Sequence, residues 1–418
     1  KYGGGIFLII YIVLALTFGY TMIVAETAIG RMTRKSPVGA FKSFGKKKWL
    51  SFGGWINAVI PVLIVPYYSV IGGWVIKYLV EYFRGNAKLL AEDGYFTDFI
   101  SNGVSTELCF VAFCAFTLII IFAGVQNGIE RVSKIMMPIL IVLSVIIAVY
   151  SVTRPGALAG VKYFLVPNVK NFSWMTVVSA MGQMFYSLSI AMGILITFGS
   201  YMKKDTAIED STRNVEVFDT GIAIMAGLMI IPAVFAFSGG DPDTLQAGPS
   251  LMFITIPKVF QNMGFGTVIG IVFFLLVLFA AITSSIALTE SAVSTFEDEL
   301  GWGRKKATVL VGVIMLVLGS LSSLGYGPLA GIKIIGMQFL DLFDFLTNSV
   351  MMPIAALLTS LLVSRVVGID KIEDEIIHGE SAFRRKKVFV VMIKYLCPVF
   401  AIIILLSSVA NALGWIKM

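Results

Sequence analysis

Charged and titratable side chains are scarce in this sequence of 418 residues. Only 14% of the residues are charged, whereas about a quarter are charged in a typical soluble domain. The single histidine, His378, lies in the charged loop 371–387, where we expect it to be solvated. Cys109, Cys114 and Cys397 stand among apolar neighbours, so we expect packed thiols. Neither zinc-ligand nor catalytic-triad spacing can be built, and the sequence therefore predicts that the protein is not an enzyme.

Apolar residues, in contrast, are abundant and arranged in long blocks. They make up 57% of the chain, and its mean hydropathy is +0.90. A helix of about 20 apolar residues crosses a hydrocarbon core about 30 Å thick. Strand-type alternation is absent, which argues against a β-barrel. The sequence therefore predicts an all-α integral membrane protein with ten candidate spans: 6–29, 52–80, 108–124, 135–152, 175–201, 220–237, 267–294, 308–324, 339–363 and 388–413.

Basic residues are distributed unevenly between the two sets of loops. If loop 31–48 faces the cytoplasm, the cytoplasmic loops hold 21 Lys and Arg and the outer loops hold 7. Positive loops remain inside, so this excess predicts the topology. We interpret the net charge of +7 as a membrane-surface property and expect no nucleic-acid partner. Loop 31–48 contains no acid, and we expect it to lie against anionic headgroups.

Two segments depart from the pattern of simple spans. The outer segment 251–257 is apolar but too short to cross the membrane, so it is either a re-entrant or capping element or a plain packing loop. Small and hydroxyl residues occupy 187–193, in the middle of span 175–201. They could simply let neighbouring helices approach closely. Alternatively the helix is broken there, which would expose backbone carbonyls to a cation and a helix amino end to an anion.

Polar residues inside or beside the spans are the remaining candidates for function. Asp219 stands at the inner end of span 220–237, where it either serves a site or reaches the inner surface. Hydroxyls within 280–285 could bind a monovalent cation or bond back to their own helix. The phenol of Tyr68 at mid-depth needs a polar partner. Asp341 and Asp344 could belong to an outer gate.

Several ordered motifs along the whole chain resemble those of the neurotransmitter:sodium symporter family. The motifs are residues 3–5 with 26–31, 128–138, 182–189 and 279–285, and Phe345. The resemblance implies two inverted five-helix repeats with a broken sixth helix, and about ten transmembrane helices in this chain. It implies that 1–418 is a single transporter domain comprising family helices 2 to 11. Helix 1 is then missing from this sequence, which we expect to be a fragment, and helix 12 is absent.

The resemblance also implies roles for individual residues. Asp344 matches the acidic partner of the outer gate and Tyr186 an aromatic lid over the substrate. The first sodium site is expected at Ser187 and Asp219. The second sodium site is expected at the Ala280 carbonyl and the hydroxyls of Thr283 and Ser284. The substrate-binding residues are then expected to be Ile64, Tyr68, Tyr186, Ser187, Ser189, Met192 and Leu288.

Two positions differ from better-known members of the family. Met192 replaces an aromatic residue, and its flexible thioether can repack around bulky ligands. Asp219 replaces the asparagine of animal members, and Ala223 follows four residues later. A carboxylate at that place would make a chloride counter-ion unnecessary, so we expect chloride independence.

The function expected from the resemblance is import of a hydrophobic or aromatic L-amino acid, coupled to sodium. The expected partners are the amino-acid substrate, sodium ions and the lipid bilayer, and the expected location is the cell inner membrane, crossed several times. Two other functions remain open. One is a non-transporting amino-acid sensor or a channel on the same scaffold, and the other is a carrier of a different small zwitterion.

Overall fold

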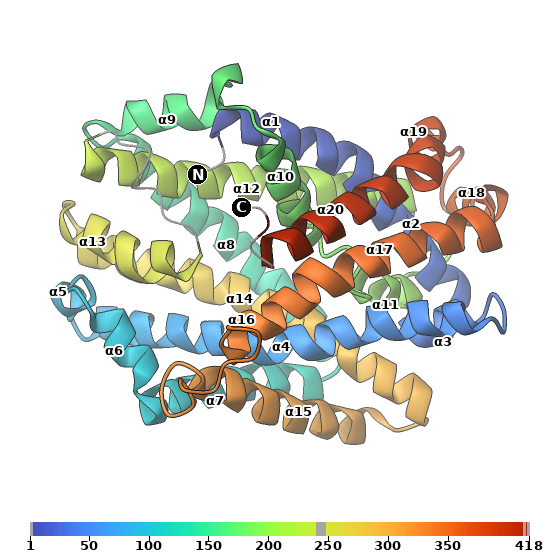
Figure 1. Cartoon of the computed structure of the whole chain (residues 1–418), viewed down its shortest axis with the longest axis horizontal. Coiled ribbons are helices and arrows are strands. Elements are labelled where there is room, and N and C mark those ends of the chain that lie inside the picture. The colour runs from blue at the N-terminus through green and yellow to red at the C-terminus, as the bar shows by residue number, and fades with distance from the viewer. Residues whose placement is uncertain (1–2, 240–247, 413–414, 416–418) are drawn as a thin grey trace.

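The computed structural model describes residues 3–239, 248–412 and 415, and it is an elongated bundle of helices (Figure 1). Nine helices within these residues are long and apolar enough to cross a membrane. Helices α3, α18 and α19 lie at one end of the bundle, and α5, α6 and α13 lie at the other. We call the first of these the cytoplasmic end, following the excess of basic residues in its loops, and the second the outer end.

Four long spans dominate the first half: Gly5–Thr33, Lys48–Phe83, Gly103–Phe122 and Val125–Val152. The first span, Gly5–Thr33, contains a single π-helical turn. In chain order the elements are α1 (Gly5–Leu14), the π turn Ala15–Gly19, α2 (Tyr20–Thr33), α3 (Pro37–Lys42), α4 (Lys48–Phe83), α5 (Ala87–Leu90), α6 (Tyr95–Ser101), α7 (Gly103–Phe122), the π turn Val125–Glu130, α8 (Arg131–Val152), α9 (Ala157–Leu165), the 3-10 turn Val169–Asn171 and α10 (Trp174–Ser187).

The second half begins after a break in the chain's helical path. Its elements are α11 (Ile194–Tyr201), α12 (Ile208–Ser238), the π turn Leu251–Thr255, α13 (Ile256–Gln261), α14 (Gly266–Leu300), α15 (Arg304–Leu324), α16 (Phe339–Asp344), the π turn Phe345–Met351, α17 (Met352–Leu361), the π turn Leu362–Val367, α18 (Ile369–Ile377), α19 (Lys386–Val391), the π turn Met392–Leu396 and α20 (Cys397–Ala412).

Nine of the ten predicted spans correspond to single long helices, and the tenth does not. The predicted span 175–201 consists of α10 and α11, separated by six non-helical residues, 188–193. The tenth predicted span is thus present as two half-helices, because the backbone conformation at 188–193 interrupts an otherwise apolar stretch. The alternative prediction of a broken helix at this place is confirmed.

The two halves of the broken helix pack against different neighbours. Helix α11 lies along α2, and α10 lies along α1. Glycines bring α2 and α11 together: a Cβ on Gly30 would lie 2.0 Å from the Ile196 carbonyl oxygen, and one on Gly199 would lie 2.6 Å from that of Thr27. Small residues at such crossings let backbones approach closely inside a membrane. This close packing fixes α11 against α2.

Two further predictions can be compared with the structure. Helix α12 begins at Ile208 and so extends beyond the start of the predicted span 220–237, which places Asp219 well inside the helix. The apolar outer segment 251–257 is helical and covers the outer end of α4, where the Tyr78 hydroxyl donates to the Phe253 carbonyl at 2.7 Å. The Phe253 ring also stacks on that of Phe96 at 5.1 Å. The segment is thus a capping element.

Candidate functional site

The break between α10 and α11 places strained backbone in the middle of the bundle (Figure 1). Ser189, Ala191 and Gly193 have φ values of 54°, 57° and 72°. Left-handed backbone is unfavourable for residues that carry a Cβ, and such strain is kept where the surroundings impose it. Burial supplies that constraint, since Ile190 and Ala191 are fully buried.

A buried carboxylate holds the break in place. Glu26 on α2 is fully buried, and its Oε1 accepts a hydrogen bond from the Ala191 amide at 2.8 Å. A backbone N–H in apolar surroundings must be satisfied, because losing its partner costs about 1–3 kcal/mol. Glu26 therefore replaces the helical hydrogen bond that the break removes. The other carboxylate oxygen, Oε2, has no partner within the described part of the chain.

A cavity of about 210 Å³ lies beside the break. Its walls come from α4, from α14 and from both sides of the break. All seven residues predicted to bind substrate line it, together with three others: Ile64, Tyr68, Tyr186, Ser187, Ser189, Met192, Ile194, Ser284, Ala287 and Leu288. Pockets for drug-sized ligands occupy about 300–1,000 Å³. This one is smaller and suits a ligand the size of one amino acid.

The residues predicted for the first sodium site meet at one edge of this cavity. Ser187, the last residue of α10, donates its hydroxyl hydrogen to Asp219 Oδ1 at 2.7 Å. The other oxygen, Oδ2, accepts from the Tyr11 hydroxyl at 2.7 Å. Asp219 is thus paired with two hydroxyls and does not reach the inner surface. Its carboxylate and the Ser187 hydroxyl supply the hard oxygen ligands that a monovalent cation prefers.

The hydroxyls of the second predicted sodium site are on α14. Thr283 donates to the carbonyls of Phe279 and Ala280 at 3.1 and 3.0 Å, which is the bond back to its own helix that the sequence left open. Its oxygen lone pairs remain able to accept a cation. Ser284 lines the cavity. Ser285 faces another direction, because its hydroxyl lies 3.1 Å from that of Thr117 on α7.

The two acids considered for an outer gate have separate partners. Asp344 Oδ1 accepts from the Tyr67 hydroxyl at 3.2 Å and from the Asn348 amide at 2.5 Å. Asp341 instead accepts from the Tyr326 hydroxyl at 3.2 Å. Tyr67 is also hydrogen-bonded to the side chain of Tyr186, which lines the cavity, so Tyr67 connects Asp344 to the cavity.

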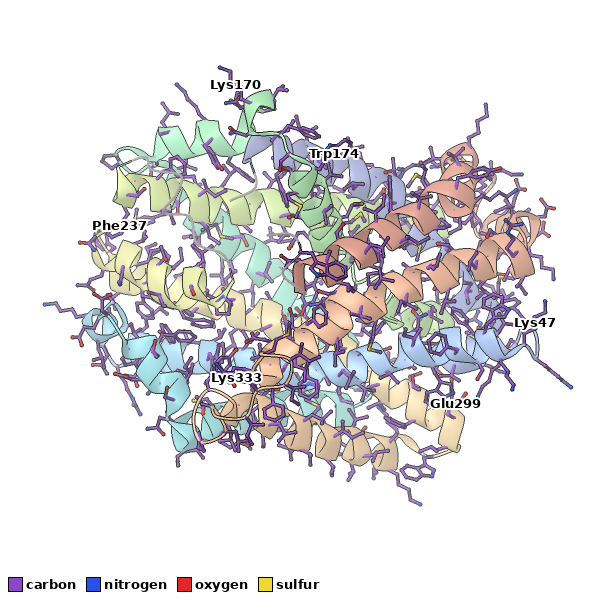
Figure 2. The ribbon with its side chains drawn as sticks, in the orientation of Figure 1. Lys47, Lys170, Trp174, Phe237, Glu299 and Lys333 are labelled. Atoms are coloured by element: carbon purple, nitrogen blue, oxygen red, sulfur yellow. The ribbon has the colours of Figure 1, made fainter. Side chains whose placement is uncertain are left out.

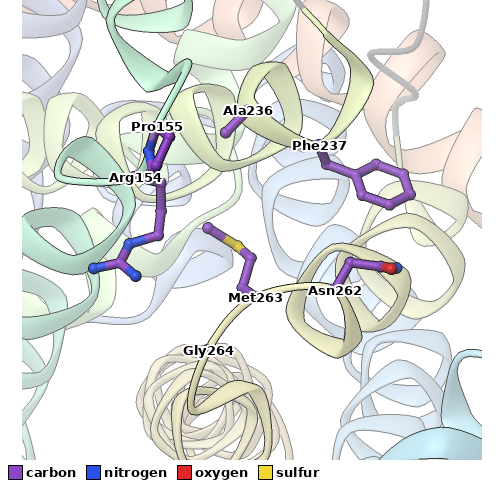
Figure 3. Close-up of a pocket in the computed structure, with 7 residues that line it drawn as sticks. All are labelled: Arg154, Pro155, Ala236, Phe237, Asn262, Met263 and Gly264. Atoms are coloured by element: carbon purple, nitrogen blue, oxygen red, sulfur yellow. The ribbon is translucent and has the colours of Figure 1, made fainter.

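A second, larger cavity of about 390 Å³ lies at the outer end, between α8, α12 and α13 (Figure 3). It is lined by Arg154, Pro155, Ala236, Phe237, Asn262, Met263 and Gly264. The Arg154 guanidinium lies 4.3 Å from the centre of the Tyr150 ring, and its Nε donates to the Tyr150 carbonyl at 3.2 Å. The cavity contains no predicted site residue and is remote from the break. We therefore assign the site to the smaller cavity.

Sequence reasoning did not identify Glu26 and Tyr11 as site residues. Glu26 had a usable signal, because an acid within a transmembrane span is a functional candidate by default. It was noted only as part of a motif. Tyr11 had no comparable signal, since its partner Asp219 is 208 residues away.

A discontinuous helix with a cavity at its break, enclosed by membrane-spanning helices, defines the class of secondary transporters. Comparison with known proteins identifies the family. The chain belongs to the sodium:neurotransmitter symporter family, whose model matches residues 1–93 and 91–415. It is accordingly a sodium-coupled transporter and not an enzyme, as predicted from the sequence.

Relatives extend over nearly all of the chain. An uncharacterized sodium-dependent transporter of Bacillus subtilis, YhdH, is 33% identical over 411 residues, which cover 97% of this chain and 90% of the relative. The human sodium- and chloride-dependent GABA transporter 2 is 25% identical over 441 residues, covering 90% of this chain and 69% of the relative. Among solved structures, MhsT in complex with L-phenylalanine matches with a TM-score of 0.87 and 33% identity, covering 98% of this chain and 92% of MhsT.

Proposed function

We propose that this protein imports a hydrophobic or aromatic L-amino acid into a bacterial cell, driven by sodium entering down its gradient. The transporter crosses the inner membrane several times, and residues 1–418 act as a single transporter domain. Sodium binds more tightly to the outward-open form and thereby shifts the population toward the state that takes up substrate. Release of sodium to the cytoplasm lets the bundle containing the broken helix swing.

The observation that carries this proposal is the cavity at the helix break. Ile64, Met192 and Leu288 give it an apolar wall, which suits the side chain of a hydrophobic amino acid. Tyr68 and the amino end of α11, which begins at Ile194, supply donors for a carboxylate. Few polar groups on an otherwise apolar wall fix the orientation of a small ligand. The match to MhsT, solved with L-phenylalanine, supports an aromatic substrate.

Sodium binds at the two oxygen-rich places beside the cavity. Ser187 and Asp219 form the first site, and the Ala280 carbonyl with the hydroxyls of Thr283 and Ser284 forms the second. Both contain residues of the cavity wall or their close neighbours, since Ser187 and Ser284 line it. Sodium and substrate therefore stabilise the same arrangement of the break. Tyr186 closes over the substrate, and Asp344 belongs to the outer gate.

Uptake into proteoliposomes tests this function directly. We expect radiolabelled phenylalanine or leucine to accumulate above the external concentration when sodium is higher outside, and not when potassium replaces sodium. A sensor or a channel on the same scaffold cannot concentrate solute. Competition by betaine-like compounds, with no competition from amino acids, would instead indicate a carrier of another zwitterion.

A paired substitution tests the second sodium site. Thr283→Val with Ser284→Ala removes two hydroxyl ligands, and we expect sodium-dependent substrate binding to be lost while the protein remains folded. Ser285→Ala is the matched control, because it removes the adjacent hydroxyl, which points to Thr117. Scintillation proximity binding over a sodium titration is the measurement. An unchanged sodium dependence in the double variant would refute the assignment.

A further inference from the structure

Three lysines at the start of α4 have no acidic partner in the described structure. Lys46, Lys47 and Lys48 are exposed and form none of its ion pairs. Figure 2 labels Lys47 at the cytoplasmic end, with Glu299 at the same end. Three neighbouring ammonium groups repel one another, and binding an anion relieves this repulsion.

Two acids at the cytoplasmic end of α14 are already paired with other groups. Glu299, at the end of α14, forms an ion pair with Lys42 at 2.6 Å. Asp298 accepts a hydrogen bond from the Ser36 amide at 2.6 Å. Both acids thus hold α3 and its flanking residues in place. The charge of the three lysines remains available to an external anion.

Two aromatic side chains continue the same face of α4 toward the bilayer centre. Phe52 is 55% exposed and Trp55 is 39% exposed. They follow Lys48 at spacings of four and seven residues, which place all three on one helix face. Seven residues of helix extend about 10 Å, the step from a headgroup to the upper acyl chain. Aromatic rings concentrate at this depth of a membrane, with basic side chains just outside.

We propose that Lys46, Lys47, Lys48, Phe52 and Trp55, which we call the lysine patch, bind anionic phospholipid of the cytoplasmic leaflet. The ammonium groups bind the phosphate and the anionic headgroup, and the two rings lie against the upper acyl chain. Each basic residue near an anionic surface strengthens such binding, and the contribution falls with salt. An acidic protein would not satisfy the patch, because Phe52 and Trp55 would then face hydrocarbon without a bound headgroup above them.

Tryptophan quenching tests the lysine patch in the full chain reconstituted into vesicles. Mixtures of phosphatidylglycerol and phosphatidylcholine are prepared with one or the other brominated in the acyl chain. The Trp55 signal is the difference between the wild type and Trp55→Phe. We expect phosphatidylglycerol to be about fivefold enriched over phosphatidylcholine at Trp55, and the enrichment to decrease as salt rises. Equal quenching by the two lipids in the wild type would overturn the proposal and favour a protein partner.

Two triple variants separate the patch from net charge. The first variant replaces Lys46, Lys47 and Lys48 together by Gln, and we expect the enrichment of phosphatidylglycerol at Trp55 to fall to about one. The control variant replaces three exposed lysines of the outer loops by Gln: Lys88, Lys170 and Lys333. It removes the same charge, and the enrichment of phosphatidylglycerol should stay at about fivefold. Equal loss in both variants, or fivefold enrichment persisting in the first, would show that the patch is not the binding site. Substrate binding in phosphatidylcholine alone verifies that each variant is folded.

Discussion

Met192 lines the cavity from a stretch of backbone that is no longer helical. Its side chain is 3% exposed, so it fills space within the protein. Methionine has three rotatable bonds and adapts to irregular volumes, unlike the rigid ring of phenylalanine. At the scale of a single residue, this position is therefore well placed to decide which substrates fit.

The substitution Met192→Phe tests that role. It exchanges flexible volume for rigid volume, and overpacking a tight site costs about 1–3 kcal/mol. We expect tryptophan to lose affinity more than leucine, because the larger ring needs the space. Competition binding over a series of amino acids measures the difference. If every substrate weakens equally, Met192 does not line the side-chain part of the cavity.

The charge of Asp219 bears on whether transport needs chloride. Its carboxylate accepts hydrogen bonds on both oxygens, from Ser187, which lines the cavity, and from Tyr11. These donors stabilise a negative charge, which would otherwise be costly in an apolar bundle. The human relative is named a sodium- and chloride-dependent transporter. We expect this protein to need no chloride, because Asp219 already balances the sodium charge.

Substituting Asp219→Asn should make uptake depend on chloride. Asparagine keeps the shape of the side chain and can still bond to Ser187 or Tyr11, but it removes the charge. Uptake in liposomes is compared in chloride and in gluconate for the wild type and the variant. Chloride dependence in the wild type, or full activity of the variant in gluconate, would leave Asp219 with only a structural role.

At the scale of elements, the interruption between α10 and α11 depends on an acid from a neighbouring helix. Residues 188–193 leave the helix, and the Ala191 amide then donates to Glu26 on α2. Close packing of α2 with α11 keeps this carboxylate in reach. The break is therefore a property of two packed helices, and Glu26 acts as a positioning residue for the site.

Removing the carboxylate should loosen the break. Glu26→Ala leaves the Ala191 amide without its acceptor, at a cost of about 1–3 kcal/mol. We expect lower thermal stability in detergent together with weaker sodium-dependent substrate binding. Glu26→Gln is the matched variant, because its amide oxygen still accepts and should preserve most of the binding. Wild-type substrate affinity in the Ala variant would show that the break does not need Glu26.

At the scale of the whole molecule, one buried ion pair joins distant parts of the chain at the cytoplasmic end. Arg31 of α2 is fully buried, and its Nε lies 2.7 Å from Glu375 of α18. The same guanidinium donates to the Thr206 carbonyl between α11 and α12 at 2.5 Å, and to the Glu375 carbonyl. Lys204 also approaches Glu375, at 3.5 Å. Arg31 thus links the broken helix to the C-terminal helices.

Breaking this pair should be costly, because it leaves a buried charge without its main partner. We expect Arg31→Met to lower the free energy of unfolding by about 3–5 kcal/mol. The double variant Arg31→Met with Glu375→Met should recover part of that loss. Chemical unfolding in detergent measures both.

The exposed pair of Lys134 and Glu130, 2.6 Å apart, serves as the control for Arg31. Lys134→Met should cost under about 1 kcal/mol, because solvent screens surface ion pairs. Similar losses for Lys134→Met and Arg31→Met would show that burial does not set the strength of the Arg31 pair.

The sequence by itself determined the class of fold and predicted ten candidate spans, and it indicated one possible place for a helix break. Span length is a property of consecutive residues, because a bilayer of fixed thickness demands an unbroken apolar run. The small residues at 187–193 were compatible with a break and equally with close helix packing, and the structure decided between the two. The resemblance to the family also named, as substrate-binding residues, seven of the ten residues that line the cavity.

Only the tertiary structure decided which polar groups meet. Tyr11 and Asp219 are 208 residues apart, Glu26 and Ala191 are 165 apart, and Arg31 and Glu375 are 344 apart. The contact between Tyr11 and Asp219, for example, depends on the rotation and depth of two long apolar spans. The hydrophobic pattern does not reveal how such a helix is rotated about its axis, because the helix has no distinct polar face. Packing at close crossings such as Gly30 and Gly199 sets that rotation, and so brings these groups together.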